Sequence, residues 1–306
     1  KVVTDFRPCT DGLNPCGCGD VTIRRCFFRT GDDCIAIKGF WNEKEYWKMP
    51  ANENILIEDC VMFSIHNGCI SFGTETAVPH YRNITVRNCD FLHQSGRNGS
   101  GWKAAIAIKM KFGTDISKIL FEDIRIGPHD QLVSLLIHPK IWRQGDLSRP
   151  GDMHDITFRN IQTRHGRAQD ITLRGYDARH VIRDVKFENL RVQGKVIEKA
   201  THPIFQHNKF ASFTCQTDES VDKGKNRVGP KQVGRRSGNW SGNWQKICNG
   251  SVTDGEAYGA DGKETWIEFE LDKPTRIESL QLYNDNSGAQ PLTPQAPNPG
   301  PPGIKL

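Results

Sequence analysis

Apolar and polar residues alternate with a period of two in a short segment that recurs along the first two thirds of the chain. Such alternation is typical of β-strands with one buried face, and these segments are rich in β-branched and aromatic residues. Six copies align, at intervals of 29 to 37 residues. The first apolar residue of each copy is Val21, Ile55, Ile84, Ile119, Ile156 or Val185.

A second apolar segment follows the alternating one in four copies, at Cys34–Ile37, Cys69–Phe72, Ala105–Ile108 and Val133–Leu136. A unit of two or three short strands cannot bury its own apolar face, but identical units can stack on one another. The pattern therefore predicts an all-β chain whose first domain, residues 1–205, is a right-handed parallel β-helix. The unequal intervals indicate loops of different length on one side of the coils.

The ten cysteines fit this repeat better than they fit a metal site. Cys26, Cys60 and Cys89 share one repeat position, which later copies fill with an aliphatic residue, so we expect a ladder of small buried side chains. Cys16 and Cys18 form a C-x-C pair, but no second pair follows at the spacing that zinc sites use. We expect neither a metal nor another cofactor.

The repeat stops near residue 205, and the composition changes after it. Residues 206–286 contain an alternating segment, 262–271, and are expected to form a second, smaller and incomplete β-sandwich. Residues 287–306 are rich in Pro and Gly with little apolar content, which is typical of a disordered tail.

Charge and hydropathy indicate which kinds of molecule the chain can bind. The net charge of +5 over 306 residues is spread along the chain, which suits an acidic substrate and does not indicate nucleic acid binding. No run of about 18 apolar residues occurs, so we expect no membrane span. The chain begins with Lys1 rather than Met, as expected for a processed form or a piece of a longer protein, and we expect a monomer.

Two short motifs place carboxylates beside glycines: Cys9-Thr10-Asp11-Gly12 and Thr30-Gly31-Asp32-Asp33-Cys34. Each motif alone is more typical of a surface turn. Asp11 and Asp32, however, are about one coil apart, and neighbouring coils lie about 4.8 Å from each other. A bend at Gly31 would let Asp32 and Asp33 face the same groove. The spacing thus predicts three converging acids.

Three carboxylates that close cannot all be ionised at neutral pH, so at least one pKa should rise. An acid beside a base is what hydrolysis of a glycosidic bond requires. The sequence therefore points to a glycoside hydrolase.

The motifs resemble those of the polygalacturonase-type pectinases of glycoside hydrolase family 28. Thr10-Asp11-Gly12, the segment Gly31–Lys38, His66-Asn67-Gly68 and Ala107-Ile108-Lys109 follow the order of the family motifs. The resemblance implies a pectic substrate and inversion at the anomeric carbon. It also implies roles: Asp32 as general acid, Asp11 and Asp33 as activators of water, His66 as a residue that tunes the acid, and Lys109 as a substrate ligand.

The chain departs from the family pattern at three places. Cys9 replaces an Asn, Asn67 replaces a Gly, and Ala107 replaces the Arg that grips galacturonate together with the Lys. Losing a bidentate carboxylate ligand weakens the case for plain polygalacturonate. Lysines could compensate, namely Lys38, Lys103 and Lys111.

Further substrate contacts are expected around the acids. Glu75 is a candidate for lining the groove. Trp41, Tyr46 and Trp47 lie in a polar insertion after Lys38, where they can stack on sugar rings or simply pack the loop.

Residues 206–286 resemble the first part of a discoidin-like (coagulation factor five/eight type) carbohydrate-binding sandwich. Val252–Gly255, Trp266–Phe269 and Pro274–Tyr283 carry this likeness. Since family 28 enzymes have several coils before the first acid motif, we expect the β-helix to be truncated at its amino-terminal end. The family likeness also implies a secreted or periplasmic protein.

Two other functions stay open. One is a dextranase-like β-helix hydrolase of neutral glucans, and the other is a β-helix that binds polysaccharide without catalysis.

Overall fold

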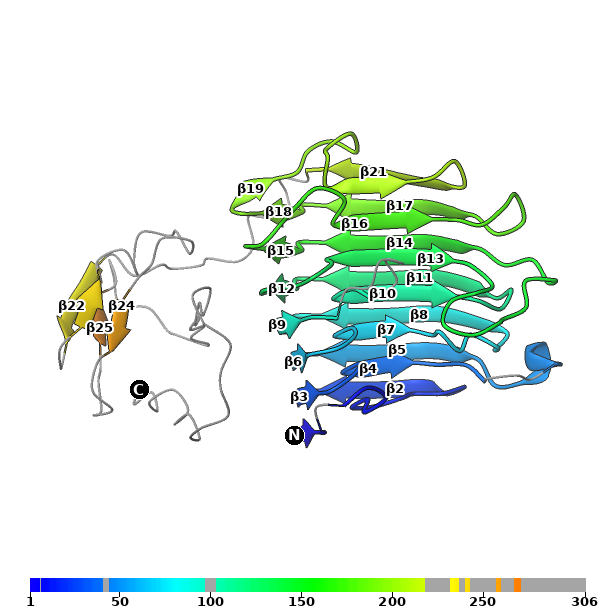
Figure 1. Cartoon of the computed structure of the whole chain (residues 1–306), viewed down its shortest axis with the longest axis horizontal. Coiled ribbons are helices and arrows are strands. Elements are labelled where there is room, and N and C mark those ends of the chain that lie inside the picture. The colour runs from blue at the N-terminus through cyan, green and yellow to red at the C-terminus, as the bar shows by residue number, and fades with distance from the viewer. Residues whose placement is uncertain are drawn as a thin grey trace. The chain divides into compact units, whose positions relative to one another are not determined.

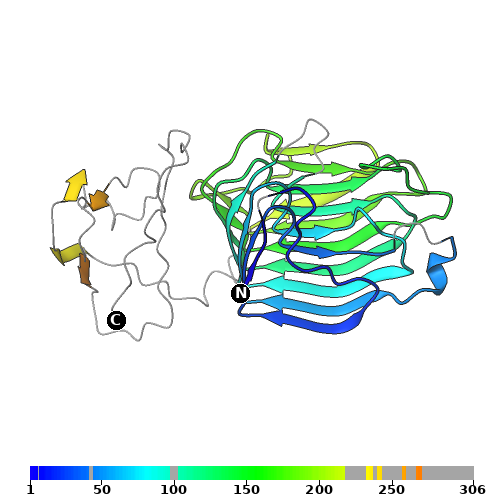
Figure 2. The same cartoon turned by 60° about the horizontal axis from the view of Figure 1, so that its bottom comes forward.

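The computed structural model describes residues 1–5, 7–40, 44–96 and 103–217, together with the backbone of four strands between residues 232 and 270. The chain divides into two compact units, Lys1–Asp222 and Lys223–Leu306. The first unit is a right-handed parallel β-helix, in which three sheets run along a stack of coils (Figures 1 and 2).

The seven-stranded sheet has the order β2-β5-β8-β11-β14-β17-β21, all parallel. Its strands are β2 (Gly19–Arg24), β5 (Asn52–Glu58), β8 (His80–Arg87), β11 (Asp115–Glu122), β14 (Met153–Arg159), β17 (Ile182–Glu188) and β21 (Ala211–Gln216). The six-stranded sheet has the order β20-β16-β13-β10-β7-β4. Its strands are β4 (Ile35–Ile37), β7 (Ile70–Phe72), β10 (Ile106–Met110), β13 (Val133–Ile137), β16 (Ile171–Arg174) and β20 (Phe205–His207).

The third sheet has eight strands in the order β1-β3-β6-β9-β12-β15-β18-β19. They are β1 (Val2–Val3), β3 (Phe27–Thr30), β6 (Val61–Ser64), β9 (Asp90–Gln94), β12 (Arg125–Ile126), β15 (Gln162–Thr163), β18 (Arg191–Val192) and β19 (Lys195–Val196). Only the last pair, β18 and β19, is antiparallel. A 3-10 helix, η1 (Tyr46–Lys48), follows β4.

The register confirms the predicted repeat. The six aligned apolar residues, from Val21 to Val185, face one another across the seven-stranded sheet. The sheet then continues beyond the prediction, because Val185 pairs with Phe213 of β21. The expected boundary at residue 205 falls inside β20, and the β-helix extends through β21, where Phe205 and Phe213 pack at 4.7 Å between ring centroids.

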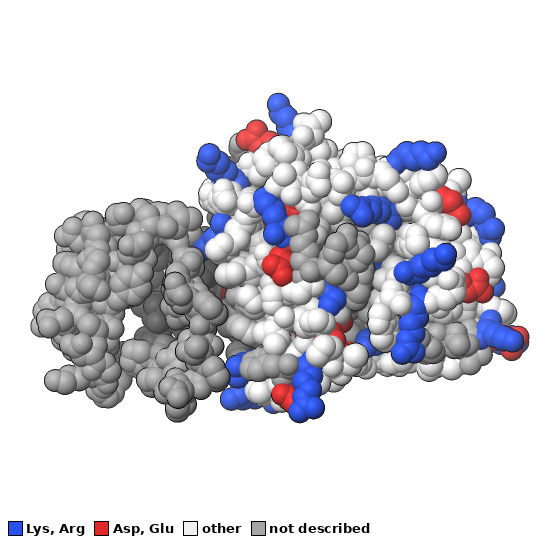
Figure 3. Space-filling model, in the orientation of Figure 1, with Lys and Arg blue, Asp and Glu red and all other residues white. Residues whose placement is uncertain are grey.

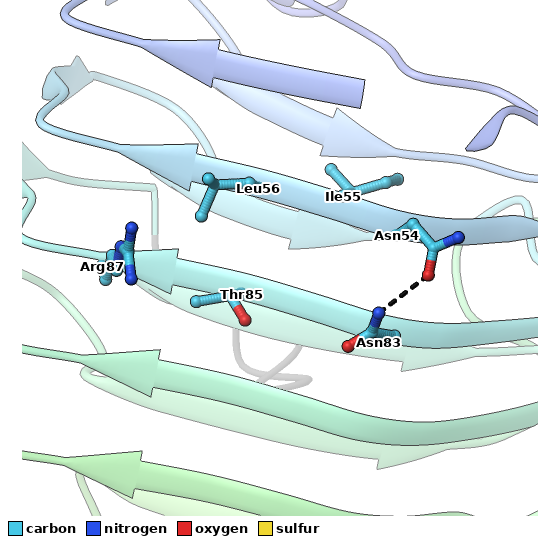
Figure 4. A pocket seen from close by; sticks show the side chains of 6 residues that line it. All are labelled: Asn54, Ile55, Leu56, Asn83, Thr85 and Arg87. Carbon is cyan, nitrogen blue, oxygen red and sulfur yellow. Dashed lines mark hydrogen bonds between the residues drawn. The ribbon is translucent and has the colours of Figure 1, made fainter. Parts of the chain in front are cut away.

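Each copy of the repeat begins and ends with a left-handed residue, which explains why Asp and Asn recur there. The first set is Asp20, Asn54, Asn83, Lys118, Asp155 and Asp184, and the second is Arg25, Asp59, Asn88, Asp123, Asn160 and Asn189, all with φ between 49° and 56°. Asn and Asp tolerate this conformation better than other residues with a side chain. Their side chains also bond along the stack: Asn83 Nδ2 donates to Asn54 Oδ1 at 2.7 Å (Figure 4).

The core inside the coils is apolar and stacked. Phe158 lies between Phe121 and Phe187, with nearly parallel rings whose centroids are 4.9 and 4.8 Å away. Cys60 and Cys89 are buried at their shared repeat position, whereas Cys26, in the first full coil, is only partly buried. The predicted ladder of small buried side chains is therefore present, with its first member less covered.

The second unit contains four short strands within the described residues. β22 (Gln232–Arg236) pairs antiparallel with β25 (Ile267–Glu270), and β23 (Trp240–Gly242) pairs antiparallel with β24 (Ala257–Gly259). β25 lies inside the predicted strand 262–271. The sandwich stays a prediction, since most residues of the discoidin likeness and the tail 287–306 lie outside the described residues. In the part of the chain that the structure describes, no helix has the length and apolar content needed to cross a bilayer.

Candidate active site

The three predicted acids meet at the edge of the six-stranded sheet. Asp32 and Asp33 lie in the turn between β3 and β4. The preceding coil places Asp11 beside them, because Gly12 N donates to Asp33 O at 2.9 Å and Leu13 pairs with Ile35. One carboxylate oxygen from each of the three residues lies within 4.8 Å of the other two.

Two glycines permit this close approach. A Cβ at Gly12 would collide with the carbonyl oxygen of Cys34, and a Cβ at Gly31 would collide with Asp5 O and Thr10 Oγ1. Gly31 lies in a bend, as the sequence predicted, and Asp32 and Asp33 reach the same cluster. The amino-terminal segment also packs closely against Gly31.

Asp11 is held by a lysine. Lys38 Nζ lies 2.7 Å from Asp11 Oδ2, and Asn14 Nδ2 donates to the same oxygen at 3.0 Å. Burial alone would lower the pKa of Lys38, but the hydrogen bond and charge of Asp11 raise it overall. The ammonium of Lys38 therefore lies directly against the carboxylate of Asp11.

Asp33 is the most buried of the three acids, at 3% exposed. Its Oδ1 accepts hydrogen bonds from Gly68 N at 2.8 Å and Ser71 Oγ at 2.5 Å, and its Oδ2 accepts one from Asn67 Nδ2 at 3.1 Å. Burial raises the pKa of Asp33 to about 6, with a further rise from the charges of Asp11 and Asp32. A proton therefore resides on this carboxyl in mildly acidic solution.

The carboxylate of Asp32 accepts hydrogen bonds from two backbone amides. Cys9 N donates to its Oδ2 at 2.5 Å, and Asp33 N donates to its Oδ1 at 3.1 Å. The resemblance assigns the role of acid to Asp32, whereas the raised pKa belongs to its neighbour Asp33. The two carboxyls are neighbours in the same cluster.

Lys109 supports Asp33 from the adjacent coils. It is 1% exposed, its Nζ donates to Ser71 Oγ at 3.3 Å, and it lies 4.0 Å from Asp33 Oδ2. The sequence placed Lys109 against substrate, yet its head group lies beneath the acids. Ser71, which links the two, is a site residue that the motifs did not reveal.

His66 is bonded to Lys103. The distance from Lys103 Nζ to His66 Nε2 is 2.9 Å, and an ammonium can only donate, so Nε2 accepts. Burial lowers the pKa of Lys103, and the charges of Asp32 and Asp33 oppose that shift. The histidine ring is thereby oriented by a lysine that sequence analysis had considered only as a possible substrate ligand.

Glu75 and the remaining lysine lie farther along the sheet. The side chain of Glu75 is half-buried, and its charge helps raise the pKa of Lys38. Burial lowers the pKa of the enclosed Lys111, and Glu75 opposes this shift. Glu75 thus lies electrostatically near both lysines.

The aromatic insertion has two different roles. Tyr46 is buried, and its hydroxyl donates to Gly113 O at 2.6 Å, so it packs the loop. Trp47 is 40% exposed and lies beneath Arg149, whose Cζ is 4.3 Å from the ring centroid. Trp41 lies outside the described residues.

The acid cluster is also, within the described residues, the one group of acids, histidines or cysteines close enough to hold a metal ion. Lys38 and Lys109 already offset the carboxylate charge, at 2.7 and 4.0 Å. These two ammonium groups would repel a cation, so the donor set fits a metal poorly. The same oxygens are close enough for one water, at about 2.7 Å from two of them, to bridge between them.

A shallow depression of about 250 Å³ lies elsewhere, over β5 and β8 (Figure 4). Asn54, Leu56, Asn83, Thr85 and Arg87 line it, without a carboxylate. It follows the side-chain ladder of the repeat and carries no acid–base pair.

The chain is similar in part to several known proteins. A probable polygalacturonase of Vitis vinifera is 35% identical over 69 residues, which are 22% of this chain and 14% of that protein. The exopolygalacturonase of Thermotoga maritima has a TM-score of 0.47 and 17% identity, over 67% of this chain and 44% of that one. The family 28 exopolygalacturonase of Yersinia enterocolitica has a TM-score of 0.40 and 15% identity, over 68% and 38%.

The chain therefore spans less than half of each of these proteins. The sequence profile of Glycosyl hydrolases family 28 matches residues 3–212. This match includes the three acids, His66 and Lys109, and covers more than half of the chain. The chain belongs to glycosyl hydrolases family 28.

Proposed function

We propose that this chain is the acid–base centre of a polygalacturonase-like glycosidase, which cleaves pectic polysaccharide with Asp11, Asp32 and Asp33. The observation that carries the proposal is the convergence of three carboxylates within 4.8 Å, with one pKa raised to about 6. A site that holds a proton and an ionised carboxylate together can both protonate a leaving group and activate water.

In the reaction, Asp32 gives its proton to the glycosidic oxygen as the bond from that oxygen to the anomeric carbon breaks. A water molecule attacks the anomeric carbon and loses a proton to Asp11 or Asp33. One water is consumed, and the proton returns to the cluster. Lys38 stabilises the ionised base, and Lys103 with His66 borders the acid.

Inversion is part of the proposal. Inverting enzymes usually hold the two carboxyl groups about 6.5 to 9.5 Å apart, and here one oxygen of each acid lies within 4.8 Å of the other two. Nucleophilic attack by a carboxylate is disfavoured, since both candidates are already engaged. Asp33 accepts three hydrogen bonds, and Asp11 binds the ammonium of Lys38 and the side-chain amide of Asn14. Water remains the better nucleophile here.

A uronate substrate fits the lysines of the site. Lys38, Lys103 and Lys109 bring positive charge to the acids, although each already contacts a side chain of the site, and Ala107 leaves the sheet without the expected arginine. Single ammonium groups recognise a carboxylate as point charges, which is less selective than a bidentate guanidinium. A partly neutral pectic polymer is therefore within the proposed substrate class, and secretion to the cell exterior or periplasm stays a prediction.

The test is release of reducing ends from a panel of pectic polymers and neutral glucans. The proposal expects hydrolysis of polygalacturonate or a related pectic polymer, reduced by high salt because the lysines are screened. Hydrolysis of dextran alone would favour the neutral-glucan alternative. Binding without hydrolysis in a version extended to the length of its relatives would favour a non-catalytic β-helix.

A further inference from the structure

Three large aromatic side chains are exposed within the described residues, and all three follow strands of the six-stranded sheet. Trp47 comes after β4, Trp142 after β13 and Tyr176 after β16, and they are 40%, 54% and 41% exposed. Exposed aromatics this large are uncommon on a soluble protein unless they contact something. Because all three follow strands of the same sheet, we infer that they contribute to one binding surface.

One loop, residues 138–149, connects the three. Its Arg149 lies over Trp47 at 4.3 Å, and the ring of its His138 lies 5.5 Å from that of Tyr176. The loop itself carries Trp142. Figures 1 and 2 show the blue helix η1 and the green loop after β13 on the same side of the coil stack.

Arginine accompanies both tryptophans. Arg149 lies over Trp47, and Arg143 lies over Trp142 with its Cζ 4.7 Å from the ring centroid. An aromatic face binds the apolar side of a sugar ring, and a guanidinium binds a carboxylate in a planar, two-pronged manner. Figure 3 shows basic side chains, in blue, together with some acidic ones, in red, on this side. The pairing fits a sugar that carries a negative charge.

The backbone conformation of Trp142 supports a role in binding. Its φ is 62°, a left-handed conformation that bulky residues rarely adopt. A residue held in such a conformation while more than half exposed gains little from packing, so outliers of this kind cluster at binding sites.

We propose that Trp47, Trp142, Arg143 and Arg149 form a second binding surface for an anionic polysaccharide, separate from the acid cluster. This inference rests on the proposed function only for the chemical class of the ligand. Asp32 and Asp33 precede β4, whereas the aromatic residues follow the strands, so the two places lie at opposite ends of strands that each span about 10 to 17 Å. A polyuronate chain of a few sugars can span that distance and contact both places.

The experiment measures binding of polygalacturonate and of dextran by affinity gel electrophoresis, in the full chain carrying Asp32→Asn so that the polymer stays intact. Trp47→Ala with Trp142→Ala should weaken the retention constant for polygalacturonate at least tenfold. Trp47→Phe with Trp142→Phe should keep most of it, and Leu92→Ala, on β9 and 46% exposed, is the matched control that should change nothing. Retention should fall at high salt, and dextran should not be retained.

Melting temperatures of all variants establish that they fold. If the folded double alanine variant retains polygalacturonate within twofold of its parent, the surface has no such role. If dextran is retained as strongly as polygalacturonate, the anionic class is wrong. If the unsubstituted chain hydrolyses no polymer, the proposed function is contradicted. The binding surface is then not affected, because the retention measurement needs no catalysis.

Discussion

Lys38 Nζ and Asp11 Oδ2 lie 2.7 Å apart and join two segments that are 27 residues apart in sequence. The pair is mostly buried, so its attraction is less screened than that of a surface pair. It places an ammonium on one carboxylate of the cluster, while burial raises the pKa of another, Asp33, to about 6. The two water-activating carboxyls assigned by the proposal therefore have different environments.

Lys38→Met should remove the charge that stabilises the ionised base. We expect turnover to fall about 10- to 100-fold, which is less than the roughly 100- to 10,000-fold that a general base supplies, because Lys38 acts through Asp11. The acidic limb of the pH–rate profile should also move to higher pH. Steady-state kinetics across pH 3 to 8 measures both, and an unchanged acidic limb would show that Lys38 does not act through Asp11.

Asp33 should make stability depend on pH. Because folding raises its pKa from 3.8 to about 6, the folded chain binds more protons between these values than the unfolded chain does. Its favourable contribution is fully present below pH 3.8 and is lost as pH rises through 6. Two pKa units correspond to about 3 kcal/mol, an upper limit for a coupled cluster.

Asp33→Asn should abolish the loss of folding stability between pH 4 and pH 7, because the amide stays neutral. Asn67 Oδ1 is buried and has no hydrogen-bond partner, so a flip of the Asn67 amide would let it accept from the new side chain. Urea unfolding at pH 4 and pH 7 should therefore show the variant gaining stability relative to the parent at pH 7, while turnover drops at least 1000-fold. A variant that is less stable than its parent at pH 7 would contradict this account of Asp33.

His66 and Lys103 should act as a unit. They are bonded at 2.9 Å, so the two single changes should each lower turnover roughly tenfold, and the double change should cost less than their product. A double-mutant cycle with Lys103→Met and His66→Ala measures this coupling. Additive effects would mean that the lysine does not position the ring.

Phe158→Ala should destabilise the β-helix unit by about 3 to 5 kcal/mol, because it removes a buried ring stacked between two others. Thr157→Ala, at the adjacent half-exposed position, should cost about 1 kcal/mol or less. Denaturant unfolding followed by circular dichroism compares the two. Similar losses at both positions would show that the phenylalanine stack is not what holds the coils together.

The repeat and the acid cluster could be predicted because both follow from periodicity. Val21 and Val185 align through a polar–apolar alternation, and Asp11 and Asp32 are one coil apart. The last coil was missed because Ser212 precedes Phe213 of β21, whereas five of the six earlier copies begin with Asn or Asp. The boundary at residue 205 was placed too early for the same reason.

The contacts around the acids could not be read from the motifs. Ser71 lies 38 residues from both Asp33 and Lys109, and it bonds to each only because three coils stack in one register. Lys103 likewise bonds to His66, 37 residues away in sequence, because their coils are stacked. Spacing predicts which coil a residue occupies, but side-chain directions at the coil edges depend on packing between loops of unequal length.

The central claim is that the Asp cluster performs acid–base hydrolysis, and the turnover of Asp32→Asn on the best pectic substrate tests it most directly. The matched control is Asp20→Asn, since Asp20 accepts a ladder bond from Asn54 Nδ2 that an Asn side chain can also accept. The account predicts that Asp32→Asn lowers turnover at least 1000-fold with little change in substrate binding, that Asp20→Asn keeps wild-type turnover, and that the wild-type product, followed by NMR, is first released with inverted anomeric configuration. Turnover of Asp32→Asn above about a tenth of wild type, or a first product of retained configuration, would contradict the roles assigned to the three acids.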